Sequence, residues 1–242
     1  MSDKQAIIEA FTDLAPRYEQ VVDSELKRFW GWSYDGFIEN LIAMTPMAED
    51  DIVLDVATGT SVIPLKLTSR GMKNGQIIGL DITLAMLRKG QQKIAALQEP
   101  SCISLTCGSA MAMPFKNGYF DVIVCGLASH HLDVPLVLAE MRRILKAGGR
   151  LTIADVGGSP VWRLPVISGL IRLGTFLYFL RKEGFSRARS EAGALSNVLT
   201  GEEWERELFK FGFKKIDVTQ LPKSHFWAPA PLVMRAEKVI SS

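Results

Sequence analysis

Short apolar runs recur through the middle of the chain, and segments with helical spacing separate them. The runs are almost continuously hydrophobic and do not alternate with polar residues, which is typical of strands that are covered on both faces. We therefore expect strands at Ile52–Asp55, Gln76–Asp81, Ile103–Cys107, Phe120–Cys125 and Arg150–Asp155.

Helical patterns fill two of the gaps between these strands. One apolar stripe consists of Leu84, Leu87, Ile94 and Leu97, and another of Leu138, Met141 and Leu145. Asp133 can cap the second helix, Pro135 suits its first turn, and Gly148-Gly149 is expected to end it. Strands that alternate with helices over short connections predict an α/β fold with a doubly wound, mostly parallel sheet.

Two regions lie outside this alternation. Residues 1–48 predict an N-terminal helical cap of two or three helices, and residues 158–200 predict a helical insertion after the fifth strand. Residues 49–157 would then form the core, and residues 201–242 would complete its sheet. This last part begins with a helix, because Thr200 and Glu203 have the spacing of a capping box, and it contains strand candidates at Lys215–Gln220 and Leu232–Lys238.

The insertion leaves several interpretations open. Its apolar side chains suit a helical pair on the core, a homodimer interface or a lid over an apolar substrate. The basic residues Arg181, Lys182, Arg187 and Arg189 follow the apolar stretch and would also support peripheral contact with an anionic membrane surface. Arginines and a proline interrupt the stretch, so its uncharged runs are too short to cross a bilayer.

The composition narrows the class of protein. The chain has 242 residues, of which 48% are hydrophobic, so it can bury the core of one large domain. Its formal net charge of +2 gives no reason to expect nucleic-acid binding. Cys102, Cys107 and Cys125 lack metal-ligand spacing, so we expect reduced thiols, no metal site and a cytoplasmic protein. The polar N-terminus is not typical of a signal peptide.

The segment from Asp51 to Ser61 carries the clearest chemical signal. An apolar strand ends in Asp55, and the small residues Ala57, Thr58, Gly59, Thr60 and Ser61 follow it. The next strand ends in Asp81. Small residues let a ligand approach the backbone closely, and an acid about 20 residues later can bind both hydroxyls of a ribose. The pattern predicts an adenosine-type cofactor.

Five segments in order make the chain resemble a known family. They are Val53–Ser61, Gly79–Leu87, Gly108–Phe115, Tyr119–Ile123 and Glu140–Gly149, and Phe11–Tyr18 matches the entry motif of the same group. The chain resembles class I S-adenosylmethionine-dependent methyltransferases, in particular the ubiquinone/menaquinone-biosynthesis C-methyltransferase group and its small-molecule relatives. The resemblance implies a Rossmann-like, seven-stranded, mostly parallel sheet with an antiparallel last strand.

The resemblance also implies a set of cofactor contacts. The loop Ala57, Thr58, Gly59, Thr60 and Ser61 would lie under the methionine part of S-adenosyl-L-methionine, with Asp55 near its ammonium group. Asp81 would accept the ribose hydroxyls, and Ile82 and Met86 would pack on the adenine. Ser109 and Ala110 would read the adenine edge, Leu127 would approach the methionine moiety, and Tyr18 would line the pocket. The product would be S-adenosyl-L-homocysteine.

Two residues depart from the family pattern. Ser61 stands where the loop usually ends in Gly, and Ser109 replaces the usual Asp that accepts from the adenine amino group. A neutral acceptor in place of a charged one predicts a loss of cofactor affinity on the order of 1 kcal/mol.

Methyl transfer mainly requires alignment of the acceptor and exclusion of water, and some acceptors also need a general base. His130 and His131 follow the fourth strand and are the candidate bases, although both can also be purely structural. The expected acceptor is a carbon or oxygen of an apolar quinone-, prenyl- or polyketide-like molecule.

Two other functions remain open. A methyltransferase fold that binds the cofactor without transferring methyl is one, and the departures at Ser61 and Ser109 motivate it. A nicotinamide-dependent oxidoreductase is the other, but the loop lacks two glycines of the G-x-G-x-x-G pattern that this class would predict.

Overall fold

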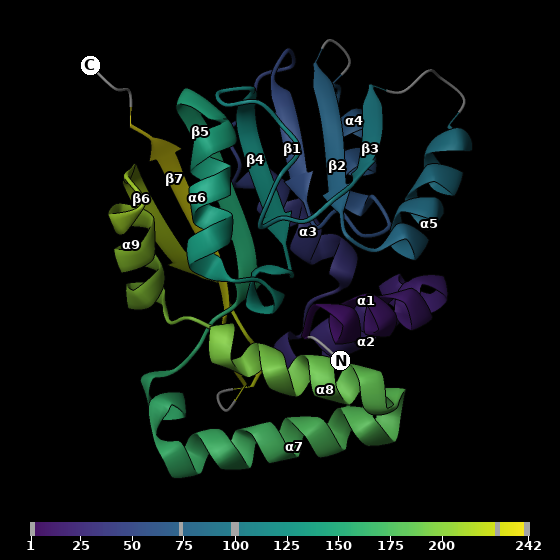
Figure 1. The fold of residues 1–242 in the computed structure, drawn as a ribbon, viewed down its shortest axis with the longest axis vertical. Helices are drawn as coiled ribbons and strands as arrows, with labels where there is room; N and C mark the ends of the chain where they lie inside the picture. The colour runs from purple at the N-terminus through teal and green to yellow at the C-terminus, as the bar shows by residue number, and fades with distance from the viewer. Residues whose placement is uncertain (1–2, 73–74, 98–101, 226–227, 240–242) are drawn as a thin grey trace.

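The computed structural model describes residues 3–72, 75–97, 102–225 and 228–239. Its centre is a seven-stranded sheet in the order β3-β2-β1-β4-β5-β7-β6 (Figure 1). The strands are β1 (Ile52–Val56), β2 (Gln76–Asp81), β3 (Ile103–Cys107), β4 (Phe120–Gly126), β5 (Leu145–Val156), β6 (Phe213–Gln220) and β7 (Pro231–Lys238). Strand β7 runs antiparallel to both of its neighbours, β5 and β6. The predicted fold class is confirmed.

Both faces of the sheet are covered, which explains the continuous apolar runs. Along β4, Ile123 and Cys125 join one core cluster, and Val122 and Val124 join the other. The first cluster receives side chains from α6 (Val134–Ile144) and α9 (Gly201–Lys210), and the second from α2 (Tyr18–Trp30), α3 (Tyr34–Ala43) and α4 (Val62–Ser69). Helix α5 (Leu84–Ala95) packs near β2 and β3. Successive residues of a strand point to opposite faces, so each face needs its own apolar partners.

Helix α6 begins as predicted and ends earlier than predicted. The Asp133 carboxylate accepts from the backbone N–H of Leu136 at 3.1 Å, which caps the helix. The expectation that Gly148-Gly149 would end it is wrong, because the helix ends at Ile144 and Leu145 is the first residue of β5. Leu145 is extended (φ −67°, ψ 140°) and fully buried, so it continues the apolar pattern of the helix while the backbone has already left it.

The remaining helices gather at one end of the sheet (Figure 1). Helix α1 (Asp3–Leu14) and the short turn Ala15–Arg17 precede α2, so the N-terminal region contains the expected helices. Helices α7 (Pro165–Glu183) and α8 (Phe185–Ala194) form the insertion after β5. Helix α8 packs against α1 and against the turn Ser129–His131, and α7 packs on the outside of α8.

The division into domains stays a prediction, while several local features of the sequence are confirmed. The capping box is formed, because the Thr200 hydroxyl accepts from the N–H of Glu203 and the Glu203 carboxylate accepts from the N–H of Thr200. The three cysteines are free thiols. Among the described residues, no helix is both long and apolar enough to cross a bilayer.

Candidate functional site

A cavity of about 380 Å³ lies at the carboxyl ends of the parallel strands, next to α1. The strand order reverses between β1 and β4, and open α/β sheets bind ligands at such a switch point. Nine of the residues predicted to bind the cofactor line the cavity: Tyr18, Ala57, Gly59, Asp81, Ile82, Met86, Ser109, Ala110 and Leu127. Of the two candidate bases, His131 lines it and His130 does not.

Strained backbone marks the two loops that meet at the cavity. Among the described residues, only four other than glycine have a positive φ, and three of them lie here: Ala57 (+58°), Ser61 (+63°) and Leu127 (+55°). Each such conformation costs on the order of 1 kcal/mol for a residue with a Cβ atom. Strain of this kind gathers at functional sites, where the loop conformation must match a ligand.

Ser61 does not line the cavity. Its side chain is fully buried and points toward α5, where a Cβ atom added to Gly90 would lie 2.1 Å from the Ser61 hydroxyl oxygen. A side chain at position 61 therefore fits only because position 90 has none. The departure from the family pattern is accommodated by a second small residue in a neighbouring helix.

Asp55 is buried behind the loop. It is 1% exposed, and neither of its carboxylate oxygens accepts a hydrogen bond from any described residue. Burial raises the pKa of Asp55 to about 8, and the charge of Asp81 adds to the shift. A buried carboxylate without a donor is costly, and a cationic ligand would relieve that cost.

Asp81 is the acid on the cavity wall. Its carboxylate accepts from the backbone N–H groups of Gly59, at 2.9 Å, and Thr83, at 2.7 Å. These contacts tie the loop after β1 to the end of β2 and fix the orientation of the carboxylate. Burial raises the pKa of Asp81 above its usual value, although the two N–H groups oppose the shift.

His131 contacts charged residues of α8 that sequence reasoning did not place at the site. Its Nε2 atom lies 3.3 Å from Glu191, and Arg187 lies 2.9 Å from the same carboxylate oxygen. Burial and the neighbouring His130 ring lower the pKa of His131, so this imidazole is neutral at neutral pH. Burial alone would favour the protonated acid, but the Arg187 guanidinium holds the pKa of Glu191 well below its usual range.

His130 is held by Asp155 at the end of β5. Its Nδ1 atom lies 2.7 Å from the Asp155 carboxylate, which also accepts from the Ser129 hydroxyl and from the N–H of His130 at 3.0 Å. Burial lowers the pKa of His130, but the Asp155 charge outweighs it and the net shift is upward. This ring belongs to the support of the turn Ser129–His131.

His130, His131 and Glu191 bring possible metal-ligand atoms within 4.8 Å of one another. Arg187, however, already pairs with Glu191 in the same place. A fixed guanidinium repels a second cation, so we assign no metal ion to this cluster.

Two further predicted residues, Thr58 and Thr60, have partners away from the cavity or behind it. The Thr60 hydroxyl donates to Glu19 at 2.7 Å, and Lys93 pairs with the same carboxylate. The Thr58 hydroxyl is buried, and the N–H of Thr58 donates to Leu80 at 3.0 Å. With Asp55 and Ser61, these residues shape the loop from behind, and their roles toward the cofactor stay predictions.

Several cavity residues were missed. Ile7, Phe11, Met111, Leu132 and Asp133 line the cavity as well. Phe11 had a signal, because it opens the motif that ends in Tyr18. Met111, Leu132 and Asp133 are sequence neighbours of predicted residues, and Ile7 belongs to no distinctive pattern. Arg187, taken from the sequence as part of an exposed basic run, is 8% exposed and stacks over Phe11 with 4.9 Å between the guanidinium carbon and the ring centroid.

Comparison with known proteins agrees with this geometry. A family profile described as "Methyltransferase domain" matches residues 54–153. The demethylmenaquinone methyltransferase of Deinococcus radiodurans is 34% identical over 179 residues, which cover 72% of this chain and 67% of the relative. The demethylmenaquinone methyltransferase of Symbiobacterium thermophilum is 29% identical over 177 residues, which cover 73% of this chain and 66% of the relative.

The chain belongs to the S-adenosylmethionine-dependent methyltransferases of class I. Its match spans about two thirds of the length of these relatives. A solved structure agrees at the level of the fold: the geranyl diphosphate C-methyltransferase of Streptomyces coelicolor A3(2) has a TM-score of 0.64 at 14% identity, covering 84% of this chain and 76% of that one.

The residues of this methyltransferase fit the family's cofactor. The buried Asp55 carboxylate lacks a donor among the described residues, which suits an ammonium group. Ile82 and Met86 give the cavity an apolar surface beside the Asp81 carboxylate, which suits an adenosine. Ser109 lines the same wall and uses its hydroxyl to accept from the N–H of Met111 at 3.2 Å.

Proposed function

We propose that this methyltransferase transfers the methyl group of S-adenosyl-L-methionine to a carbon or oxygen atom of an apolar small molecule, such as a quinone-, prenyl- or polyketide-like acceptor. The observation that carries the proposal is the composition of the cavity. Beyond the residues assigned to the cofactor, its walls are mainly apolar and have three polar side chains, Thr83, His131 and Asp133; the apolar side chains are those of Ile7, Phe11, Leu80, Met111, Ala128 and Leu132. Apolar walls with few polar groups suit an apolar ring or chain.

The names of similar proteins support the acceptor class. The relatives from Deinococcus radiodurans and Symbiobacterium thermophilum are demethylmenaquinone methyltransferases, and the structural neighbour was solved with geranyl diphosphate and S-adenosylhomocysteine. A diphosphate needs a cluster of cations, whereas the lining of this cavity contains no Lys or Arg among the described residues. We therefore favour an uncharged ring or chain over a prenyl diphosphate.

The bound cofactor supplies an activated methyl group on a sulfonium, and the protein has to align the acceptor and exclude water. Phe11 and Tyr18 cover the cavity from the N-terminal helices, and they lie 6.4 Å apart between ring centroids. We assign to them the exclusion of water and the positioning of the acceptor.

We assign to His131 the role of accepting a proton from the acceptor. It lines the cavity, it is neutral at neutral pH, and Glu191 beside Nε2 favours the tautomer in which Nδ1 accepts. The Nδ1 atom is buried and accepts no hydrogen bond from a described residue, so the acceptor reaches it only when side chains around the cavity move. His130, in contrast, is fixed by Asp155 and serves as a positioning residue.

The cofactor part of the proposal is tested by calorimetric titration with S-adenosylhomocysteine, with NAD as the parallel control. We expect micromolar binding of S-adenosylhomocysteine alone, and Asp81→Asn should weaken it at least tenfold because the ribose loses a charged acceptor. Asp217→Asn, which changes an acid on β6 outside the cavity, should leave affinity unchanged. Binding of NAD in place of S-adenosylhomocysteine would overturn the proposal.

The catalytic part is tested with a panel of quinones, prenylated phenols and polyketides and a radiolabelled methyl donor. His131→Asn should lower kcat about 100-fold or more with an acceptor that loses a proton, while His130→Asn should act mainly through the position of the turn. In the unsubstituted enzyme kcat should rise with pH up to the lowered pKa of His131, below about 6.5, and then level off. Tight cofactor binding without turnover of any acceptor would favour the repurposed, non-catalytic alternative.

A further inference from the structure

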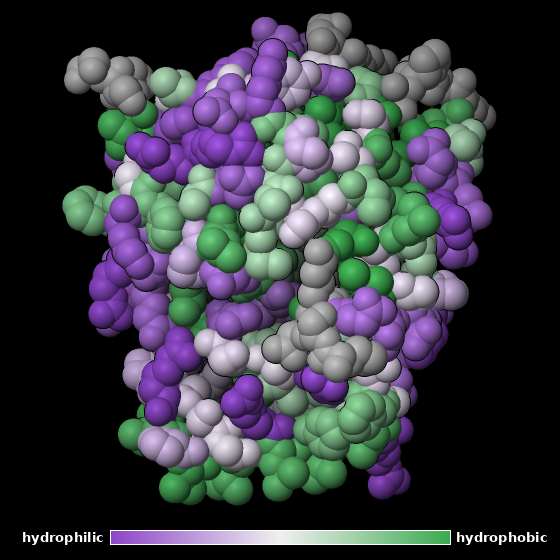
Figure 2. Space-filling model, in the orientation of Figure 1, coloured by the Kyte–Doolittle hydropathy of each residue, from purple (hydrophilic) through white to green (hydrophobic). Residues whose placement is uncertain are grey.

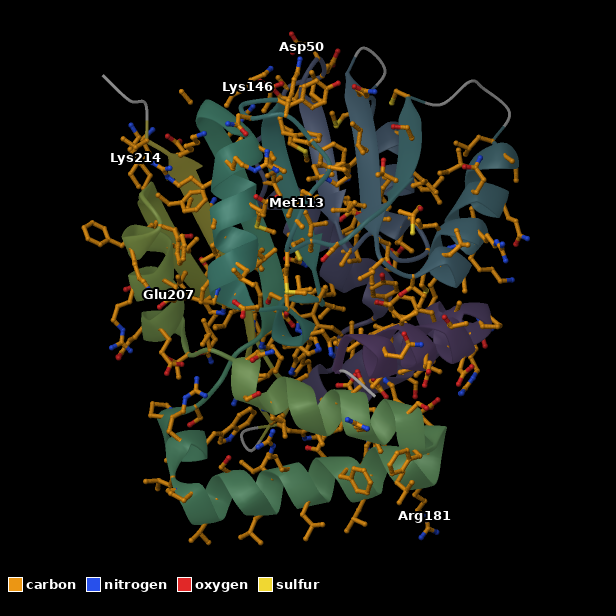
Figure 3. All side chains as sticks on the ribbon, in the orientation of Figure 1. Asp50, Met113, Lys146, Arg181, Glu207 and Lys214 are labelled. Atoms are coloured by element: carbon orange, nitrogen blue, oxygen red, sulfur yellow. The ribbon has the colours of Figure 1, made fainter. Side chains whose placement is uncertain are left out.

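Helix α7 exposes a continuous apolar stripe. Val166, Leu170, Leu173 and Leu177 are 75%, 64%, 55% and 53% exposed, and their spacing of three and four residues places them on one face. Val161, Leu164, Leu180 and Phe185 extend the exposed apolar surface at both ends. Figure 2 shows this surface along the lower edge of the molecule, and in Figure 3 the side chains of α7 point away from the protein.

The stripe is not needed to hold the helix in place. The opposite face of α7 has its own partners, since Phe179 is buried and Tyr178 lies 6.0 Å from Phe29 between ring centroids. Exposed leucines scattered singly are ordinary, but a row of them on one helix marks an interaction surface. We call Val166, Leu170, Leu173, Leu177 and Leu180 the α7 stripe.

The exposed charges of α7 itself have one sign. Residues 160–190 are all described, and they contain six basic residues and a single acid, Glu183, although Arg163 pairs with Glu203 and Arg187 is buried beside Glu191. The Glu183 side chain is 3% exposed and pairs with Arg17 at 2.6 Å, so it presents no negative charge to the outside. Arg172, Arg181 and Lys182 are exposed; Arg172 also donates to the carbonyl of Ala192, Lys182 also pairs with Glu25, and Arg181 lies at the end of the helix in Figure 3.

We propose that α7 docks on the surface of an anionic lipid bilayer, with the α7 stripe inserted into the interface and the basic residues facing the headgroups. An amphipathic helix that lies in the membrane plane combines exposed leucines with Lys and Arg on its flanks. Long basic side chains can reach the headgroups while the leucines contact the acyl chains. This proposal does not depend on the identity of the acceptor.

A second copy of the chain fits the α7 stripe less well. In a two-fold symmetric pair the same patch meets itself, so each copy would bring only basic exposed charges of α7 to the contact. All exposed charges of α7 are positive, so such a pair gains no salt bridges across the contact. The charge pattern therefore favours lipid over protein.

Docking through α7 would turn the cavity end of the molecule toward the bilayer. Helix α8 lies between α7 and α1, and α1 contributes Ile7 and Phe11 to the cavity (Figure 1). An apolar acceptor dissolved in the membrane would then reach the enzyme without crossing bulk water.

The test is flotation of the full chain with vesicles of phosphatidylcholine alone or mixed with phosphatidylglycerol. We expect binding to the mixed vesicles, weak binding to phosphatidylcholine, and release as salt is raised. Changing Arg172, Arg181 and Lys182 to Gln should weaken binding by about fivefold per residue, since each basic residue near the surface contributes about 1 kcal/mol.

The double variant Leu170→Asp with Leu177→Asp should have a vesicle affinity that is lower by about tenfold or more for each substitution. Each change removes inserted carbons and adds a negative charge. The matched control is Leu136→Asp with Phe209→Asp, which alters two exposed apolar residues on α6 and α9. Affinity for S-adenosylhomocysteine should be the same in both variants, which shows that they fold. Affinity for vesicles that is equal in both variants would overturn the proposal. A second result would also overturn it: the unsubstituted protein does not bind vesicles but forms a dimer, and Leu170→Asp with Leu177→Asp dissociates that dimer.

Discussion

Replacement of Gly90 by Ala tests how the loop after β1 is accommodated. In most helix interiors this change stabilises by about 1 kcal/mol, because Ala is the better helix former. Here the new Cβ atom would lie 2.1 Å from the hydroxyl oxygen and 3.0 Å from the Cβ of Ser61. Overpacking of a closed site costs about 1–3 kcal/mol, so we expect Gly90→Ala to lower the free energy of unfolding by about 1–2 kcal/mol.

The outcome should reverse when Ser61 is replaced by Gly. Ser61→Gly removes the side chain that collides, a buried hydroxyl without a partner among the described residues, and the strain of a positive φ, about 1 kcal/mol. In that background Gly90→Ala should stabilise by about 1 kcal/mol. The two substitutions are therefore coupled by about 2–3 kcal/mol.

Urea unfolding followed by circular dichroism measures this coupling in a double-mutant cycle. The four proteins are the unsubstituted chain, the two single variants Gly90→Ala and Ser61→Gly, and the double variant. Gly169→Ala is the matched control, because a Cβ atom there meets nothing within 4 Å, and it should have the same small effect in both backgrounds. A coupling energy below about 0.5 kcal/mol would show that Ser61 turns away freely and that our reading of the contact is wrong.

Three further predictions concern the site and its surroundings. Ser109→Asp should tighten S-adenosylhomocysteine binding by about 1 kcal/mol, measured by calorimetry, and an unchanged or weaker affinity contradicts it. Affinity for S-adenosylhomocysteine should rise as the pH is raised toward 8. The ligand ammonium needs the ionised form of Asp55, and the pKa of Asp55 is about 8 in the free protein. Asp55→Asn should remove this dependence of affinity on pH. Thr200→Ala should lower the free energy of unfolding by about 1 kcal/mol through loss of the cap, and Thr200→Ser should restore most of it.

Much of the fold could be predicted because the sheet is covered on both faces. Each central strand had to be apolar throughout, so runs such as Phe120–Cys125 stand out from the amphipathic helices between them. The same rule explains the error at Leu145. A buried helix end that leads directly into a buried strand shows no polar break, and the spacing from Met141 fits the helix although the backbone is already extended.

Part of the site could be predicted because parallel topology brings the ends of β1, β2 and β4 to one edge. Asp81 and Leu127 follow from that rule together with the family motifs. The contacts of His131 with Glu191 and Arg187 could not be predicted, because they depend on how α8 packs against the turn Ser129–His131. The direction of the Ser61 side chain depends on a positive φ and on the absence of a side chain at Gly90, which no local pattern encodes.

The unpaired carboxylate of Asp55 has a consequence for the lifetime of the protein. A buried acid without a donor among the described residues lowers the stability of the cofactor-free form, and a ligand that binds only the folded state raises it in proportion to its concentration. Molecules without cofactor therefore unfold more often and are the first to be degraded by proteases. The amount of this methyltransferase in a cell should accordingly follow the supply of its methyl donor.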